Sequence, residues 1–232
     1  MTTSPPQEHQ IIEHIVLFNV KEDNEDYPTK VNAMVNALNN LNSLDSVLHL
    51  TAGPILRTRS KPAHLKYTHM LHGRYLTVSD LYNYSLDPDH VSVVDSLVRP
   101  LCEDVMAVDW SADVGPSTTL VPRPGSAMRV TFLQVEDEGE KEAFFEGVRK
   151  IIKEGIVGPY EQISYGNNFS DRGKGYSVAT LVVFPDLNEL DACEEYEDHM
   201  KSLVHKIKCS HDHILTVDYL VPRLASMNPA VE

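Results

Sequence analysis

The chain has 232 residues and is 42% apolar, which is enough for one or two compact domains with buried cores. Its 34 acidic residues against 20 lysines and arginines give a net charge of −14. That charge repels phosphate backbones and anionic lipid head groups, so neither nucleic acid nor a membrane surface is an expected partner.

The cysteines and the chain start predict the compartment. Cys102, Cys193 and Cys209 are odd in number and show no metal-type or C-x-x-C spacing, which is typical of free thiols in a reducing environment. Residues 1–10 are polar and run directly into a strand-like segment, so no signal sequence is expected. No apolar run approaches the ~18 residues that span a bilayer. The sequence therefore predicts a soluble cytoplasmic protein.

The first half opens with residues 14–20, which are apolar on both faces and predict a buried strand. Pro28 then stands where a first-turn proline is tolerated, and apolar residues follow at helical spacing, so a helix is expected next. Residues 47–55 predict a second strand that ends at Gly53 and Pro54.

The rest of the first half completes one small α/β unit. Residues 67–76 predict a third strand, and Thr77 with Asp80 makes a capping box for a short helix. Pro88 restarts a helical pattern, and residues 105–110 predict a closing strand. The order strand, helix, strand, strand, helix, strand is that of a ferredoxin-like β-α-β-β-α-β domain.

The second half repeats the first. Four pairs of like residues are each separated by 109 positions: Tyr67 and Tyr176, Leu81 and Leu190, His90 and His199, Asp109 and Asp218. Such a constant register indicates two homologous copies. Nearer the start, Val16 and Val130 give an offset of 114. The second copy is therefore expected to lack about five residues, in the connection that corresponds to residues 57–65.

The predicted fold is α+β, with two tandem ferredoxin-like domains at residues 11–110 and 127–223. Residues 111–126 are rich in proline and glycine and predict a linker, and residues 224–232 a tail. Each sheet has one open face, and a short linker holds the second copy at high effective concentration. The two domains are expected to pair as an intramolecular dimeric α/β barrel, and any ligand cavity is expected between a sheet and its helices or at the seam between the two sheets.

Four motifs of the first half resemble the stress-responsive dimeric α/β barrel (Dabb) domain of plants, in members that carry two such domains. They are residues 13–18 (EHIVLF), 67–69 (YTH), 87–91 (DPDHV) and 108–110 (VDW). One protein of this family is a polyketide cyclase that closes a linear tetraketide by aldol condensation without metal or cofactor. The resemblance implies the barrel fold and a role in stress response, and it makes a cofactor-free cyclase or lyase a candidate activity.

By the same resemblance, Tyr84 and His90 match the cyclase's catalytic tyrosine and histidine, and His14 and His69 match two further pocket histidines. A neutral imidazole can take a proton from a carbon between two carbonyls, and a phenol can hydrogen-bond to the growing enolate. His90 would be the base and Tyr84 the donor, acting on a polyketide-like or β-dicarbonyl substrate. Apolar walls are expected to hold a hydrophobic tail: Leu17, Leu38 and Leu81.

A non-catalytic reading stands beside this one. Asp87 occupies a position where the cyclase motif has a histidine. Half-buried histidines and packed tyrosines are common in ordinary cores, and the fold hosts many functions. The alternative is therefore a stress-associated binding or assembly module without enzymatic activity.

The second copy lacks most of the candidate site. At an offset of 114 or 109, Met128 replaces His14, Val178 replaces His69 and Cys193 replaces Tyr84, which leaves only His199. Any chemistry is therefore expected in the first copy. His211 and His213 form an H-x-H pair with no third ligand nearby in sequence, so no metal and no cofactor are expected.

Overall fold

We describe a computed structural model that covers residues 9–22, 26–114, 119–155, 160–207 and 209–223. The first half has the predicted element order: β1 (His9–Val20), α1 (Tyr27–Asn40), β2 (His49–Ser60), β3 (His69–Tyr75), α2 (Val78–Leu86), α3 (Pro88–Val93) and β4 (Cys102–Val114). A π-helical stretch, Val94–Val98, and a single turn, α4 (Arg99–Leu101), continue α3. β4 runs four residues into the predicted linker, and the predicted tail lies outside the described residues.

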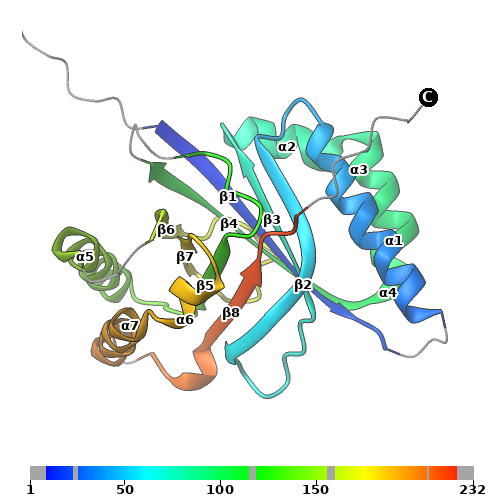
Figure 1. Cartoon of the computed structure of the whole chain (residues 1–232). Helices are drawn as coiled ribbons and strands as arrows, with labels where there is room; N and C mark the ends of the chain where they lie inside the picture. Colours follow the sequence, from blue (N-terminus) through cyan, green and yellow to red (C-terminus); the bar gives the residue numbers. More distant parts are fainter. Residues whose placement is uncertain (1–8, 23–25, 115–118, 156–159, 208, 224–232) are drawn as a thin grey trace, which may run out of the picture.

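The second half repeats this order with shorter strands: β5 (Ala127–Leu133), α5 (Glu138–Glu154), β6 (Gln162–Asn167), β7 (Val178–Phe184), α6 (Leu187–Asp191), α7 (Glu194–Lys206) and β8 (Ile214–Leu220). All eight strands form one antiparallel sheet in the order β4-β1-β3-β2-β8-β5-β7-β6. Figure 1 shows this sheet curving between two groups of helices, α1 to α4 on one outer side and α5 to α7 on the other. The tandem dimeric α/β barrel that the sequence predicted is confirmed.

β2 joins the two halves, and it does not stop where the sequence predicted. It pairs with β3 as far as Pro54 and then with β8 from Ile55 onward. Beyond Pro54, Ile55 N still donates to the Thr68 carbonyl oxygen at 2.8 Å, and the opposite edge of β2 takes β8 as its partner. The prediction of a strand end at Gly53 and Pro54 was wrong because the new partner, β8, lies more than 150 positions further along the chain.

The strand registers also correct the alignment of the two copies. His14 lies opposite Gly73 and Asp109, and Arg129 lies opposite Val182 and Asp218. Positions 73 and 182, like 109 and 218, are 109 apart, whereas 14 and 129 are 115 apart. The predicted offset of 114 is one residue short, and a slip of one residue exchanges the two faces of a strand. Arg129, and not Met128, therefore occupies the place of His14.

The shortening of the second copy is mostly where the sequence placed it. Gln162 lies opposite Val183 as His49 lies opposite Arg74, so positions 49 and 162 are 113 apart. Two residues are thus lost before β6 and four more before β7. β6 ends at Asn167, the counterpart of Pro54, while β2 continues as a six-residue arm to Ser60. In the second half the corresponding segment, residues 168–172, is not a strand, but it also crosses to the other half and bonds to β4.

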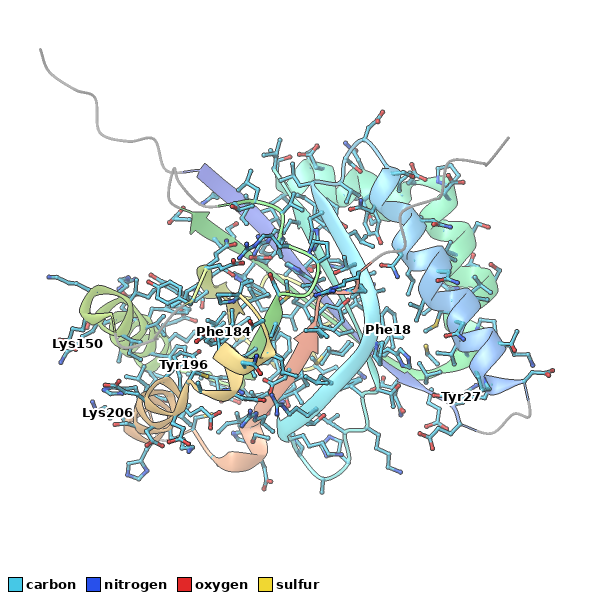
Figure 2. The ribbon with its side chains drawn as sticks, in the orientation of Figure 1. Phe18, Tyr27, Lys150, Phe184, Tyr196 and Lys206 are labelled. Atoms are coloured by element: carbon cyan, nitrogen blue, oxygen red, sulfur yellow. The ribbon has the colours of Figure 1, made fainter. Side chains whose placement is uncertain are left out.

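Side chains fill three cores. One lies inside the barrel and draws on both halves, and the other two lie between the sheet and each group of helices. In Figure 2, Phe18 belongs to the core under α1, and Phe184 and Tyr196 belong to the core under α5 and α7. Lys150 and Lys206 lie on the exposed outer side. Burying each large apolar side chain contributes ~1.5–3 kcal/mol to folding.

A fully buried polar network crosses the barrel interior. Glu13 Oε1 accepts from Arg74 Nη2 at 2.8 Å, and Glu13 Oε2 accepts from His72 Nε2 at 2.7 Å. Ser164 of the second half donates to Glu13 Oε1 at 2.9 Å. Burial opposes the charge of Glu13, but Arg74 and His72 hold the pKa of this carboxyl well below its usual range. The network therefore ties the two copies together around one ion pair.

Candidate functional site

The candidate site of the first half is built on a buried pair, His14 and Asp109, which face each other on β1 and β4. His14 Nδ1 lies 2.5 Å from Asp109 Oδ1, and the two residues are 4% and 6% exposed. Burial acts to raise the pKa of Asp109, yet His14 beside it lowers that pKa below its ordinary value. An ionised carboxylate can only accept, so we assign the hydrogen to Nδ1 of His14, and Nε2 is left for other contacts.

Three aromatic rings gather around His14. Tyr84 of α2 lies with its ring centroid 6.2 Å from that of His14, and Tyr75 of β3 lies 5.3 Å from Tyr84. The ring centroid of His90, on α3, lies 4.4 Å from that of Tyr84, and the two rings are tilted by 50°. The structure thus brings together His14, Tyr84 and His90, three of the four polar residues that the resemblance marked.

The environment sets the protonation of these groups. Burial raises the pKa of Tyr84, so its hydroxyl stays protonated and can donate. Burial lowers the pKa of His90, which favours the neutral imidazole. His90 Nδ1 lies 3.1 Å from the carbonyl oxygen of Ser85, which can only accept, so Nδ1 carries the hydrogen and Nε2 keeps a free lone pair. Tyr84 and His90 therefore have the states that a donor and a base require.

A segment of the second half covers this cluster. Phe169 N donates to the Asp109 carbonyl oxygen at 2.9 Å, and Asp109 N donates to Asn168 Oδ1 at 3.0 Å. The positive charge of Arg172 acts to lower the pKa of Asp109, Tyr84 and His90. The sequence did not identify this segment as part of the site. No sequence signal marks it, because its role arises only when the barrel closes.

His69 lies away from the cluster. It is opposite Phe18 on β1, four residues along the strand from the His14 level, and thus ~13 Å away. Its Nδ1 lies 2.9 Å from Thr68 Oγ1, and burial lowers its pKa. The structure does not bring His69 to the site of Tyr84 and His90.

The predicted apolar walls divide between two cores. Leu38 and Leu81 belong to the helix-facing core of the first half, together with Tyr75 and Tyr84. Leu17 belongs to the barrel interior. The prediction that Leu17 lines the same pocket as His14 is corrected. Successive residues of a strand point to opposite faces, so two residues three positions apart lie on opposite sides of the sheet.

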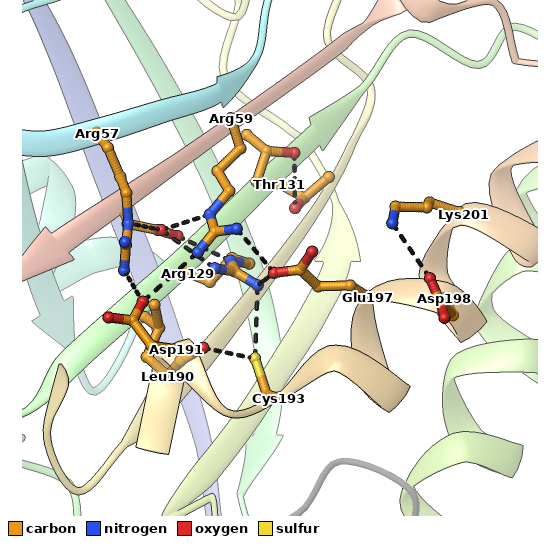
Figure 3. A network of polar contacts seen from close by, with 12 residues as sticks. Arg57, Arg59, Arg129, Thr131, Leu190, Asp191, Cys193, Glu197, Asp198 and Lys201 are labelled. Carbon is orange, nitrogen blue, oxygen red and sulfur yellow. Dashed lines mark hydrogen bonds and ion pairs between the residues drawn. The ribbon is translucent and has the colours of Figure 1, made fainter. Parts of the chain in front are cut away.

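The same level of the second half carries a different set of residues. Arg129 and Asp218 form a buried ion pair, with Nε 2.8 Å from Oδ1, in place of His14 and Asp109. Cys193 stands for Tyr84, and His199 stands for His90, with its Nδ1 2.8 Å from the Glu195 carbonyl oxygen. Arg57 and Arg59, from the arm of β2, also form ion pairs with Asp218, and Figure 3 shows both arginines beside Arg129. A cavity of about 570 Å³ lies beside this network.

Within the described ranges, no group of three or more His, Cys, Asp or Glu side chains is arranged to hold a metal ion.

Among the helices of the described residues, none has the length and apolarity to cross a membrane.

Solved structures share this architecture over nearly the whole chain. A putative monooxygenase from Fusobacterium nucleatum matches 93% of this chain and 94% of its own, with a TM-score of 0.60 and 15% identity. An anthrone oxidase-like protein matches 91% of each chain, with a TM-score of 0.60 and 9% identity. Identities this low show a shared two-domain barrel fold and no more.

Closer relatives are found by sequence. The family model described as Stress responsive A/B Barrel Domain matches residues 12–112. One stress-response A/B barrel domain-containing protein of Arabidopsis thaliana is 42% identical over 225 residues, which cover 96% of this chain and 82% of that protein. A second protein of the same plant and the same description is 39% identical over 213 residues, 91% of this chain and 97% of its own. The chain therefore belongs to the stress-response A/B barrel domain family.

Proposed function

We propose that the first half is a cofactor-free acid–base catalyst, a cyclase or lyase that performs aldol-type chemistry on a β-dicarbonyl or polyketide-like small molecule. The observation that carries the proposal is the close approach of His90 to Tyr84, with ring centroids 4.4 Å apart, next to the buried pair of His14 and Asp109. The three free cysteines support a reducing, cytoplasmic setting for this activity.

The chemistry divides between two side chains. Nε2 of neutral His90 takes the proton from the carbon between two carbonyls, and the hydroxyl of Tyr84 donates a hydrogen bond to the oxygen where enolate charge grows. The carbanion then attacks a second carbonyl carbon, and His90 returns its proton to the resulting alkoxide. His14, oriented by Asp109, contacts the Tyr84 ring edge-on and helps to keep it in place.

The experiment measures proton abstraction, the first step, without knowledge of the natural substrate. The probe is ethyl acetoacetate in D2O, with loss of its α-proton signal followed by NMR. We expect acceleration over buffer, a loss of about 10²- to 10⁴-fold for His90→Ala, and a smaller loss for Tyr84→Phe. The matched control is His199→Ala, because His199 holds the corresponding place in the second half and should leave the rate unchanged. Exchange at the buffer rate with wild-type protein would contradict the proposal, as would equal losses at His90 and His199.

A second candidate function is a non-catalytic binding or assembly module. The observation that favours it is packing: Tyr75 is fully buried, Tyr84 is 2% exposed, and both belong to the closed core under α1 and α2. This candidate predicts that Tyr84→Phe and His90→Ala change stability in urea without changing any exchange rate. The same NMR series therefore separates the two functions.

A further inference from the structure

We infer that the second half holds a binding site of its own, beside α7 and the arm of β2, for a small amphipathic anion such as a medium-chain carboxylate. The site is independent of the proposed catalysis in the first half. Its volume of about 570 Å³ falls within the ~300–1,000 Å³ typical of small-molecule sites.

The polar end of the cavity is cationic. Arg59, Arg129 and Lys201 line it, and Glu197 is the carboxylate among the lining residues. Behind the lining, Asp218 is fully buried and accepts from Arg57 Nε, Arg59 Nε and Arg129 Nε at 2.7 to 2.8 Å. One buried carboxylate thus faces three guanidinium groups. Two further carboxylates, Asp191 and Glu197, pair with the outer sides of these arginines, and Glu197 is about as exposed as Arg59.

The geometry already accommodates a carboxylate. Arg59 Nη1 and Arg129 Nη1 converge on the same oxygen, Glu197 Oε1, at 2.9 and 2.6 Å (Figure 3). Arg59 Nη2 lies 3.7 Å from Asp191 Oδ1, beyond hydrogen-bond reach, so this nitrogen keeps donor capacity for a ligand. A ligand carboxylate can add to Glu197 at this fork or displace it, because the Glu197 side chain is 26% exposed.

The other end of the cavity is apolar. Its walls come from α7 and the start of β8: Tyr196, Met200, Val204 and Ile214. A cationic end and an apolar end in one cavity select a ligand with one anionic group and a hydrocarbon body. Because the chain carries a net charge of −14, long-range attraction does not explain such binding, and the local fork of arginines must supply it.

The site depends on the tandem arrangement. Arg59 lies on the arm of β2, which belongs to the first half, while Arg129 and Met200 belong to the second. Residues 168–172, which follow the shorter β6, cross β4 of the first half in the equivalent way, and Arg172 lies 113 positions after Arg59. The first half, however, has His14 where the second half has Arg129, so the pair of arginines that converges on Glu197 belongs to the second half.

The test uses decanoate as the probe, with decan-1-ol as the uncharged ligand of equal chain length, and measures binding to the full chain by calorimetry. We expect one decanoate per chain, bound at least about tenfold more tightly than decan-1-ol. Arg59→Gln should weaken decanoate binding about tenfold or more and leave decan-1-ol unchanged, because Arg59 is partly exposed and its loss spares the buried pair of Arg129 and Asp218.

Two further variants locate the site. Val204→Trp fills the apolar end and should abolish binding of both ligands, whereas Arg149→Gln, which removes an exposed arginine of α5, should change neither. Absence of decanoate binding, equal affinity for decan-1-ol, or binding that Arg59→Gln and Val204→Trp leave intact would overturn the inference. The comparison of the two ligands on wild-type protein remains decisive even if a variant fails to fold.

Discussion

Arg129 holds in the second half the position that His14 holds in the first, and each faces the aspartate of the neighbouring strand, Asp218 or Asp109. An imidazole of the first half thus has its counterpart in a guanidinium that stays charged in proteins. The two copies keep the same backbone and the same aspartate, but the residue that pairs with the aspartate differs in chemistry between them.

The ion pair inside the barrel is expected to dominate the stability of the paired halves. Glu13→Gln removes the charge that balances Arg74, which stays fully buried. We expect a loss of ~3–5 kcal/mol in the free energy of unfolding, measured in urea. The control is Glu142→Gln, which removes an exposed partner of Arg149 and should cost less than ~1 kcal/mol. Similar losses in both variants would show that the buried ion pair contributes no more to stability than an exposed one.

Stability should fall on mild acidification because of His49. Burial lowers the pKa of His49 to about 2. Below pH 6.5, His49 therefore binds a proton in the unfolded chain but stays neutral in the folded protein. The contribution of neutral, buried His49 to the free energy of unfolding is complete above pH 6.5. It is lost as the pH falls towards 2, at up to ~1.4 kcal/mol per pH unit. His49→Gln should reduce the slope of unfolding free energy between pH 7 and 5, measured in urea. His64→Gln, at an exposed histidine, should not.

The covering segment of the second half should be visible in the titration of His90. Arg172→Gln removes a positive charge that opposes protonation, so the pKa of His90 should rise, although only modestly because Arg172 is solvent-exposed. Imidazole NMR shifts followed against pH measure this. Lys174→Gln is the matched control, since Lys174 lies in the same segment but pairs with Asp104. An unchanged titration of His90 in Arg172→Gln would show that the charge of Arg172 does not act on His90.

The two edges where the copies meet are expected to respond differently to one methyl group. A Cβ at Gly166 of β6 would lie 2.8 Å from the Ser111 carbonyl oxygen and 3.0 Å from the Trp110 side chain, so the backbone has to shift. Gly166→Ala should cost ~1–3 kcal/mol. At Gly53, its counterpart in β2, the nearest atom would be 3.6 Å away, so Gly53→Ala should be near neutral. Thermal unfolding of both variants makes the comparison, and equal melting points would disprove it.

The sequence by itself determined the two copies, their element order and the barrel they form, because hydrophobic periodicity and turn residues act over short stretches of chain. It also placed His14, Tyr84 and His90 in one half. The exact alignment of β1 with β5 could not be read from the sequence. Val16 aligned with Val130 at an offset of 114 matches two apolar residues, and only the pairing of the strands shows which face each residue is on.

Contacts between distant segments were decided by the tertiary structure alone. The change of partner at Pro54, the cover of Asp109 by residues 168–172 and the reach of Arg59 towards Arg129 all join positions at least 59 residues apart. The separation of His69 from Tyr84 likewise follows from strand rise and not from residue type. Local propensity carries no information on such meetings, because they depend on how the whole sheet closes.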